Sequence, residues 1–160
     1  MPLPDGAARP PSLLASWALR VGTAAALAID ATVHLRDATG YDAVRATVSQ
    51  GQLFRVEAGL AVVAALLVLV WPQRISWVVA LLVAASALGA VLLYRYVDVG
   101  QLGPLPDMYE NTWQVPGKLL SAYAEGAAVV LAGLGLLTHR RAAPTRTTAD
   151  ARAPEAMHRR

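Results

Sequence analysis

The chain is 160 residues long, and 56% of those residues are apolar, which is too many for an ordinary soluble domain. It contains no cysteine, which excludes disulfide bonds, thiolate nucleophiles and dithiol redox relays, and with them a membrane thiol oxidase. The net charge of +3 comes largely from the C-terminal tail, so no nucleic-acid partner is expected. The expected partner of that tail is the anionic surface of a lipid bilayer.

The apolar residues are gathered into four blocks, each near the ~20 residues that cross a ~30 Å hydrocarbon layer. They predict transmembrane helices at about 13–35, 54–71, 75–95 and 118–138. The predicted fold class is therefore all-α, an integral membrane four-helix bundle over 12–139. The proline-rich lead 1–11 and the basic tail 140–160 are expected to be disordered.

The connections between these helices differ in length. The first, 36–53, is polar, and its segment 41–45 is compatible with a short interfacial helix. The second is a short turn, which predicts an antiparallel hairpin with Trp71 and Trp77 near one interface. The third, 97–117, is rich in proline and glycine and is much longer than the usual 2–8 residues, so a lid is expected there.

Basic residues near the helix ends favour both termini on the cytoplasmic side. In that orientation eight arginines lie inside, against five basic residues outside. Positive charge is normally in excess on the cytoplasmic side. The end of the bundle that carries 36–53 and 97–117 would then face outward.

The first predicted helix has one polar face. Its members recur at intervals of four and three residues, the spacing that aligns side chains on a helix, and they are Ser16, Arg20, Thr23, Leu27, Asp30, His34 and Asp37. The opposite face has no ionisable group and consists of Leu14, Val21, Ala25, Ala28 and Leu35. Because charged groups at membrane depth are costly, we expect the polar face to turn toward the other helices.

Polar residues from all four predicted helices fall in the outer half of the bundle. They are Asp30, His34, Glu57, Tyr94, Arg95 and Glu125. At 1.5 Å per residue, the three carboxylates lie within about 10 Å of the outer helix ends. We therefore expect one polar cluster at a common depth.

The residue types leave several roles open for this cluster. It is compatible with a satisfied polar network that fixes helix packing. It is equally compatible with a proton relay through Asp30 and Glu125, in which His34 changes charge near neutral pH, or with a site for a small solute or a quinone headgroup under the loop. Asp30, His34, Glu57 and Glu125 also supply oxygen and imidazole atoms that could bind a metal. A di-metal carboxylate centre or a bis-histidine haem is not expected, because no helix has a Glu-x-x-His pair and only one histidine lies well inside the membrane, and no metal is predicted.

Arg20 is a separate feature on the inner side. It lies ten residues from Asp30, or about 15 Å along a helix, which is too far for direct pairing. A long side chain at this depth is expected to snorkel to the cytoplasmic headgroups. The alternative is a contact with a partner subunit or an acidic ligand.

Two short motifs resemble the DoxX-like family of small bacterial membrane proteins. Arg20, followed fourteen residues later by His34-Leu35, is similar to the first-helix pattern of that family, in which an arginine precedes a lysine or histidine. The stretch Val56-Glu57-Ala58-Gly59-Leu60, before an aliphatic run and a short turn, resembles the family's helix-two glutamate. The resemblance covers about 12–94.

The resemblance implies a four-helix protein of the bacterial inner membrane, often of unknown activity and sometimes a subunit of quinone-linked redox complexes. Arg20, His34 and Glu57 would be the family positions in this chain. Asp30 and the loop 97–117 depart from the family pattern, which puts a shared substrate in doubt.

The expected function is that of an accessory subunit in a quinone-linked membrane redox complex. No catalytic role is predicted, since the chain has no nucleophile–base pair or phosphate loop. No bound cofactor is predicted, a quinone is compatible with the resemblance, and the expected partners are a membrane redox protein or further copies of the chain. The alternatives are a small proton-coupled transporter or channel-like protein and a purely structural membrane protein.

Overall fold

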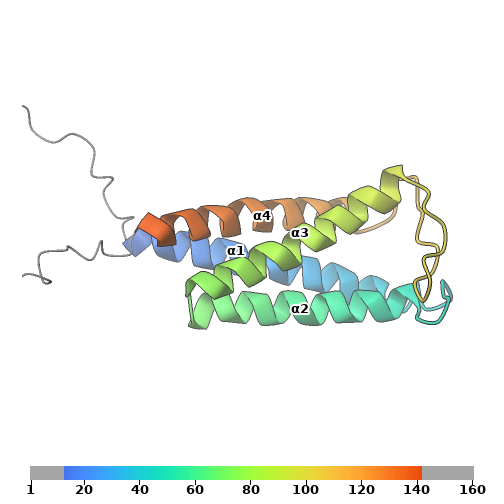
Figure 1. Cartoon of the computed structure of the whole chain (residues 1–160), viewed down its shortest axis with the longest axis horizontal. Helices are drawn as coiled ribbons and strands as arrows, with labels where there is room; N and C mark the ends of the chain where they lie inside the picture. Colours follow the sequence, from blue (N-terminus) through green and yellow to red (C-terminus); the bar gives the residue numbers. More distant parts are fainter. Residues whose placement is uncertain (1–12, 142–160) are drawn as a thin grey trace, which may run out of the picture.

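The structure is a computed structural model that describes residues 13–141. It consists of four helices, which are α1 (Leu13–Asp37), α2 (Gln50–Val70), α3 (Arg74–Tyr96) and α4 (Lys118–Arg141). The predicted all-helical fold is confirmed. The start of α1 and the end of α4 lie together at one end of the bundle (Figure 1), here called the terminal end. The connections 38–49 and 97–117 lie at the opposite end, here called the loop end.

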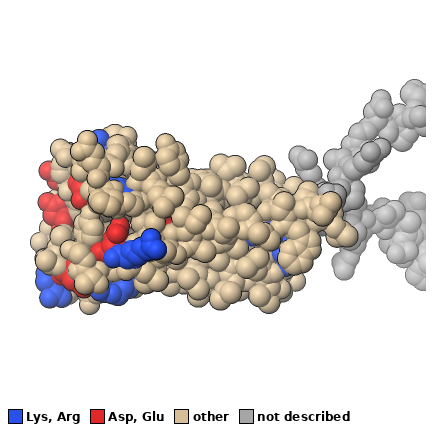
Figure 2. Space-filling model, turned by 180° about the vertical axis from the view of Figure 1, so that it is seen from behind, with Lys and Arg blue, Asp and Glu red and all other residues tan. Residues whose placement is uncertain are grey.

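Each of the four helices is long and apolar enough to cross a membrane, as expected for a multi-pass membrane protein. Large apolar side chains are exposed along their outer faces. Charged side chains gather at the loop end on the face shown in Figure 2, and the middle of that face is almost free of them. This surface suits a hydrocarbon layer, because lipid tails accept apolar side chains and exclude charged ones.

Small residues bring the helices close together. Alanine dominates the core, where Ala61, Ala64, Ala80, Ala128 and Ala132 have no exposed surface. Packing of small residues replaces the hydrophobic effect as the main attraction between helices in lipid. One face of α4, with residues spaced four and three apart, is buried at Ser121, Glu125, Ala128, Ala132 and Gly135, whereas His139, the next position on that face, is exposed.

Helix α2 begins at Gln50, four residues before the predicted start. Ser49 caps it, because its hydroxyl accepts a hydrogen bond from the backbone N–H of Gln52 and the Gln52 side chain accepts one from the backbone N–H of Ser49. This reciprocal pair satisfies two backbone donors at the helix start. The short helix proposed at 41–45 is wrong, since those residues form turns and bends.

The other helix boundaries differ from the predicted ones by a few residues. Helix α4 continues through Arg141, so residues 140 and 141 are helical rather than disordered. The disorder expected for 1–11 and for 142–160 concerns residues outside the described part of the chain.

Trp77 lies in the core, in the first turn of α3. Its side chain is only 4% exposed and packs against Gly135 of α4, where an added Cβ would collide with the indole ring. Trp71, in contrast, is exposed. The glycine therefore creates the space that lets α3 and α4 approach near the terminal end.

We predict that Gly135→Ala lowers the free energy of unfolding by about 1–3 kcal/mol, the usual cost of overfilling a packed core. Thermal unfolding in detergent, followed by circular dichroism, measures this change. Gly133→Ala in the same helix is the matched control, because no atom lies within 4 Å of its added Cβ, and it should be neutral or slightly stabilising. Equal unfolding temperatures for the two variants would contradict the packing described.

Candidate functional site

A buried hydrogen-bonded cluster joins α1 to α4 in the half of the bundle nearer the loop end. Asp30 and Glu125 are 0% and 1% exposed. The Ser121 hydroxyl oxygen lies 2.7 Å from Asp30 Oδ1 and 2.8 Å from Glu125 Oε1. His34 Nδ1 lies 2.9 Å from Asp30 Oδ1 and 3.2 Å from the Asp30 carbonyl oxygen. These four residues are named the junction below.

The junction follows from helical spacing. Asp30 and His34 are four residues apart on α1, and Ser121 and Glu125 are four apart on α4, so each pair shares a helix face. The expected inward turn of the polar face of α1 is confirmed, because Thr23, Leu27, Asp30 and His34 are buried. The side expected to meet lipid is exposed at all five of its positions.

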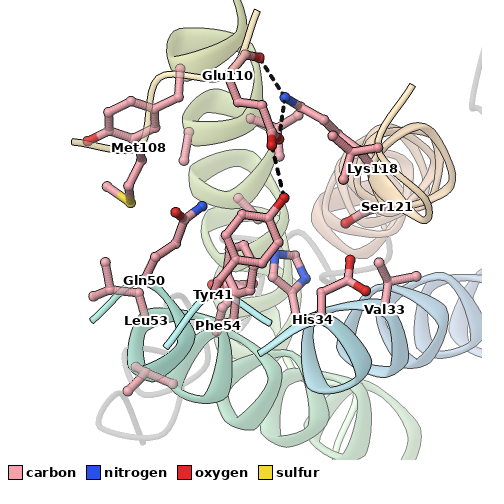
Figure 3. A pocket seen from close by; sticks show the side chains of 18 of the residues that line it. Val33, His34, Tyr41, Gln50, Leu53, Phe54, Met108, Glu110, Lys118 and Ser121 are labelled. Atoms are coloured by element: carbon pink, nitrogen blue, oxygen red, sulfur yellow. Dashed lines mark hydrogen bonds and ion pairs between the residues drawn. The ribbon is translucent and has the colours of Figure 1, made fainter. Parts of the chain in front are cut away.

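A cavity of about 330 Å³ lies beside the junction, toward the loop end. Helices α1–α4 and both long connections contribute to its walls, which include Val33, His34, Tyr41, Gln50, Phe54, Val56, Glu57, Ser86, Ala87, Ala90, Tyr94, Met108, Glu110, Lys118 and Ser121. Figure 3 shows the Gln50, Phe54 and His34 side chains on one side of this space and Lys118 and Ser121 on the other. His34 and Ser121 belong to both the wall and the junction.

The remaining members of the predicted cluster separate from the junction. Glu57 lines the cavity, and its buried Oε1 has no hydrogen-bond partner among the described residues. Tyr94 also lines the cavity. Arg95 was wrongly expected there, since its guanidinium lies over the rings of Tyr96 and Trp113, at 4.9 and 5.7 Å from their centroids.

The loop 97–117 covers the cavity and is held by one carboxylate. Glu110 accepts hydrogen bonds from the Tyr41 hydroxyl and from Lys118 Nζ, both at 3.0 Å (Figure 3). Its backbone N–H donates to the Tyr94 carbonyl oxygen at 3.0 Å. Burial, and then the hydrogen bond to Glu110, raise the pKa of Tyr41 to about 12, so its hydroxyl keeps its proton at neutral pH. The expected lid thus has a latch formed by Tyr41, Glu110 and Lys118.

The first connection is anchored to α2 by an exposed ion pair. Arg55 binds Asp42 with two hydrogen bonds of 2.7 Å, the fork geometry that favours arginine over lysine. The hydrogen bonds from Arg55 lower the pKa of the Asp42 carboxyl. An added Cβ at Gly51 would collide with Asp42 and with the Ala38 carbonyl oxygen, so this connection needs glycine there. The wall residue Tyr41 is thereby held in place.

Arg20 has a partner inside the protein. Its guanidinium donates to the carbonyl oxygens of Val68 and Leu69 at the end of α2 and lies 4.0 Å from the Trp17 ring centroid. The last carbonyls of a helix lack intrahelical donors and carry negative potential. The side chain therefore caps α2 instead of extending freely toward headgroups, and it lies in the terminal half, away from the junction.

The junction contains donor atoms of the kinds that bind metals. One atom each from Asp30, His34 and Glu125 lies within 4.8 Å of the others. The Nδ1 of His34, however, faces two acceptors of Asp30, so it carries a hydrogen there and offers no lone pair to an ion. In the structure these atoms form the hydrogen-bonded contacts described above.

Several site residues were missed in the sequence. Ser121 was given no role, although its hydroxyl connects the two carboxyls. Tyr41, Glu110 and Lys118 lie on or beside long connections, where no periodic pattern shows which side chains meet. The proline and glycine content of the loop was the available signal, and it indicated a cover without identifying the residues of the latch.

No protein-family model, curated protein or solved structure significantly matches this chain. Functional inference therefore rests on the junction, the cavity and the latch.

We predict that Tyr41→Phe loosens the lid. Loss of one hydrogen bond, worth about 0.5–1.5 kcal/mol, should speed amide hydrogen exchange at Glu110 by about two- to tenfold. Hydrogen-exchange mass spectrometry of the protein in lipid nanodiscs measures this change. Tyr109→Phe is the control, because Tyr109 is in the same loop but exposed and should leave exchange unchanged. Identical protection in all three proteins would show that Tyr41 does not hold the loop.

Proposed function

We propose that this chain is a quinone-binding accessory subunit of a membrane redox complex. In this proposal it is a DoxX-like protein of the bacterial inner membrane, with both termini in the cytoplasm. The observation that carries the proposal is a mostly apolar cavity that holds a few polar side chains and has exposed wall residues on α2 and α3. We infer from these exposed residues that the cavity opens sideways, between the two helices, toward the region where lipid would lie. A ligand that enters from the bilayer and carries a polar ring fits such a site better than a water-soluble solute does.

The sideways opening lies between α2 and α3. These helices meet at the short turn after Val70 and diverge toward the loop end (Figure 1). Val56 of α2 and Ser86 and Ala90 of α3 line the cavity and are also exposed on the outer surface. A ligand held there can keep its head inside and its hydrocarbon tail in lipid.

The few polar side chains of the wall suit a group that alternates between carbonyl and hydroxyl. A quinone offers two hydrogen-bond acceptors, and the corresponding quinol offers two donors. Histidine, glutamine and tyrosine side chains can donate or accept, and His34, Gln50 and Tyr94 all line the cavity. The buried Oε1 of Glu57 is an available acceptor. The volume of about 330 Å³ is at the lower end of the range for ligand pockets and suits a ring rather than a whole lipid.

An accessory role follows from the chemistry of these residues. They exchange protons and form hydrogen bonds, whereas electrons would enter and leave the quinone through a partner protein. Copurification from native membranes in mild detergent tests this assembly. Expected companions are a quinone in the lipid extract and a redox protein on the gel, and a homogeneous preparation that lacks both would overturn the accessory role.

A small proton-coupled transporter is the second candidate, favoured by the continuous hydrogen bonds that join Glu125, Ser121 and Asp30. It predicts a pH-driven solute flux in liposomes that Glu125→Gln abolishes. A purely structural protein predicts neither this flux nor quinone binding.

We predict that Ala90→Phe weakens the binding of a short-tail naphthoquinone about tenfold or more. The new ring fills the mouth of the cavity, and overfilling typically costs about 1–3 kcal/mol. Quenching of tryptophan fluorescence in nanodiscs measures the affinity. Ala85→Phe is the matched control, because Ala85 is an exposed residue of the same helix outside the cavity wall. Equal affinities for the two variants would place any quinone site elsewhere.

A further inference from the structure

The Ser121 hydroxyl is within hydrogen-bonding distance of two carboxyl groups at once, at 2.7 Å from Asp30 Oδ1 and 2.8 Å from Glu125 Oε1. A hydroxyl has a single hydrogen to donate, so it can serve only one of the two oxygens. Toward the other oxygen it presents a lone pair, which makes a hydrogen bond only if that carboxyl is protonated. The geometry therefore requires one shared proton on the Asp30–Glu125 pair.

His34 indicates where that proton resides. Its Nδ1 faces Asp30 Oδ1 at 2.9 Å and the Asp30 carbonyl oxygen at 3.2 Å, and because both are acceptors, Nδ1 carries a hydrogen. Asp30 Oδ1 thus receives the His34 N–H and is also placed to receive the Ser121 hydroxyl. Glu125 Oε1 has Ser121 as its hydrogen-bond partner. Each contact among Glu125 Oε1, Ser121, Asp30 Oδ1 and His34 Nδ1 pairs one donor with one acceptor when Glu125 is the protonated acid and Asp30 is the anion.

The surroundings of Glu125 disfavour two charges. Asp30 Oδ2 and Glu125 Oε2 are buried and have no hydrogen-bond partner within residues 13–141, and two adjacent carboxylates in such a site share a proton rather than both ionising. The ionisable groups of the helices beside the pair are His34 and Asp37 of α1, Glu57 of α2 and Tyr94 of α3, all of which line the cavity. Tyr41, Glu110 and Lys118 of the latch lie at the far wall.

We propose that the junction is a proton-transfer site in which Glu125 stores a proton that moves through Ser121 to Asp30. In the transfer, the O–H bond of Glu125 breaks as an O–H bond forms on Ser121. The original O–H bond of Ser121 breaks as one forms on Asp30 Oδ1. No electrons are transferred, and the negative charge moves from Asp30 to Glu125.

The position of this proton controls His34 at the cavity wall, an inference that rests on the proposed quinone site. When Glu125 holds the proton, the Asp30 anion accepts the Nδ1 hydrogen of His34 and strengthens the other ring nitrogen as a base. That nitrogen can then accept a proton from a quinol hydroxyl as a partner protein removes electrons. When Asp30 holds the proton, His34 loses the adjacent negative charge and is a weaker base. Glu125 is therefore a positioning residue for proton exchange with the ligand.

Infrared spectroscopy of the ligand-free full chain in lipid nanodiscs tests the stored proton. A protonated carboxylic acid has a C=O stretch well separated from carboxylate bands. We expect such a band in the unmodified protein, a shift to lower frequency in D₂O, and loss of the band in Glu125→Gln. Asp107→Asn, which removes an exposed carboxyl, is the control and should leave the band intact.

A second variant, Ser121→Ala, shows whether the infrared band comes from Glu125 or from a protonated Glu57. It also keeps the test decisive if Glu125→Gln does not fold. It retains all three carboxyls but removes the acceptor of the Glu125 proton, so the band should shift to higher frequency. An acid on Glu57, which has no bond to Ser121, would not respond. Absence of the band, a band unaffected by both variants, or one lost only in Asp30→Asn would overturn the assignment. Stoichiometric metal that is lost in Glu125→Gln would overturn it as well.

The two proposals can fail separately. A carboxylic acid band without naphthoquinone binding would retain the stored proton and remove the quinone function. Naphthoquinone binding that leaves the band unchanged would retain the quinone site and remove its coupling to Glu125. Where both hold, the naphthoquinone shifts the band in the unmodified protein but not in Ala90→Phe at the same concentration.

Discussion

The hydrogen bonds of one serine hydroxyl connect the two helices that carry the charged core. Ser121 and Asp30 are 91 positions apart in the chain, and their contact holds α4 against α1 at a buried position. Ionised groups in such surroundings persist only when they are paired or neutralised. In the proposed arrangement, the junction meets this constraint by sharing one proton between Asp30 and Glu125 through Ser121. Removing one member of the junction would leave a buried polar group without its hydrogen-bond partner in an apolar environment.

Differences in packing around this junction create the cavity. Alanine-rich faces draw α1, α2 and α4 together, and Trp77 fills the space over Gly135 where α3 meets α4 near the terminal end. Farther along, α3 leaves α2, and the space between them is closed only by the connections. The binding site and the packed core are thus consequences of the same four helices, with small residues where they touch and polar residues where they separate.

Helical periodicity made much of this arrangement predictable. Each long apolar block became a helix, and the spacing of Asp30, His34, Ser121 and Glu125 indicated which faces meet. What periodicity could not provide is contact between segments that lack it. The capping box at Ser49 extended α2, and the latch depends on turns that bring Tyr41 and Glu110 together across 69 positions. Arg95 was predicted at the same depth as the polar cluster, but its guanidinium lies over the rings of Tyr96 and Trp113 instead.

In the proposed quinone site, the latch also determines which compartment supplies the ligand. Tyr41, Glu110 and Lys118 tie the first connection, the loop and the start of α4 across its end, and Val48 donates a further backbone hydrogen bond to Pro104 in the loop. Entry from that end requires several of these bonds to break together, whereas entry between α2 and α3 requires none of them to break. Occupancy would then follow the mole fraction of ligand dissolved in the bilayer, independent of its much lower concentration in water. The occupancy of such a site would therefore change with the amount of quinone dissolved in the membrane.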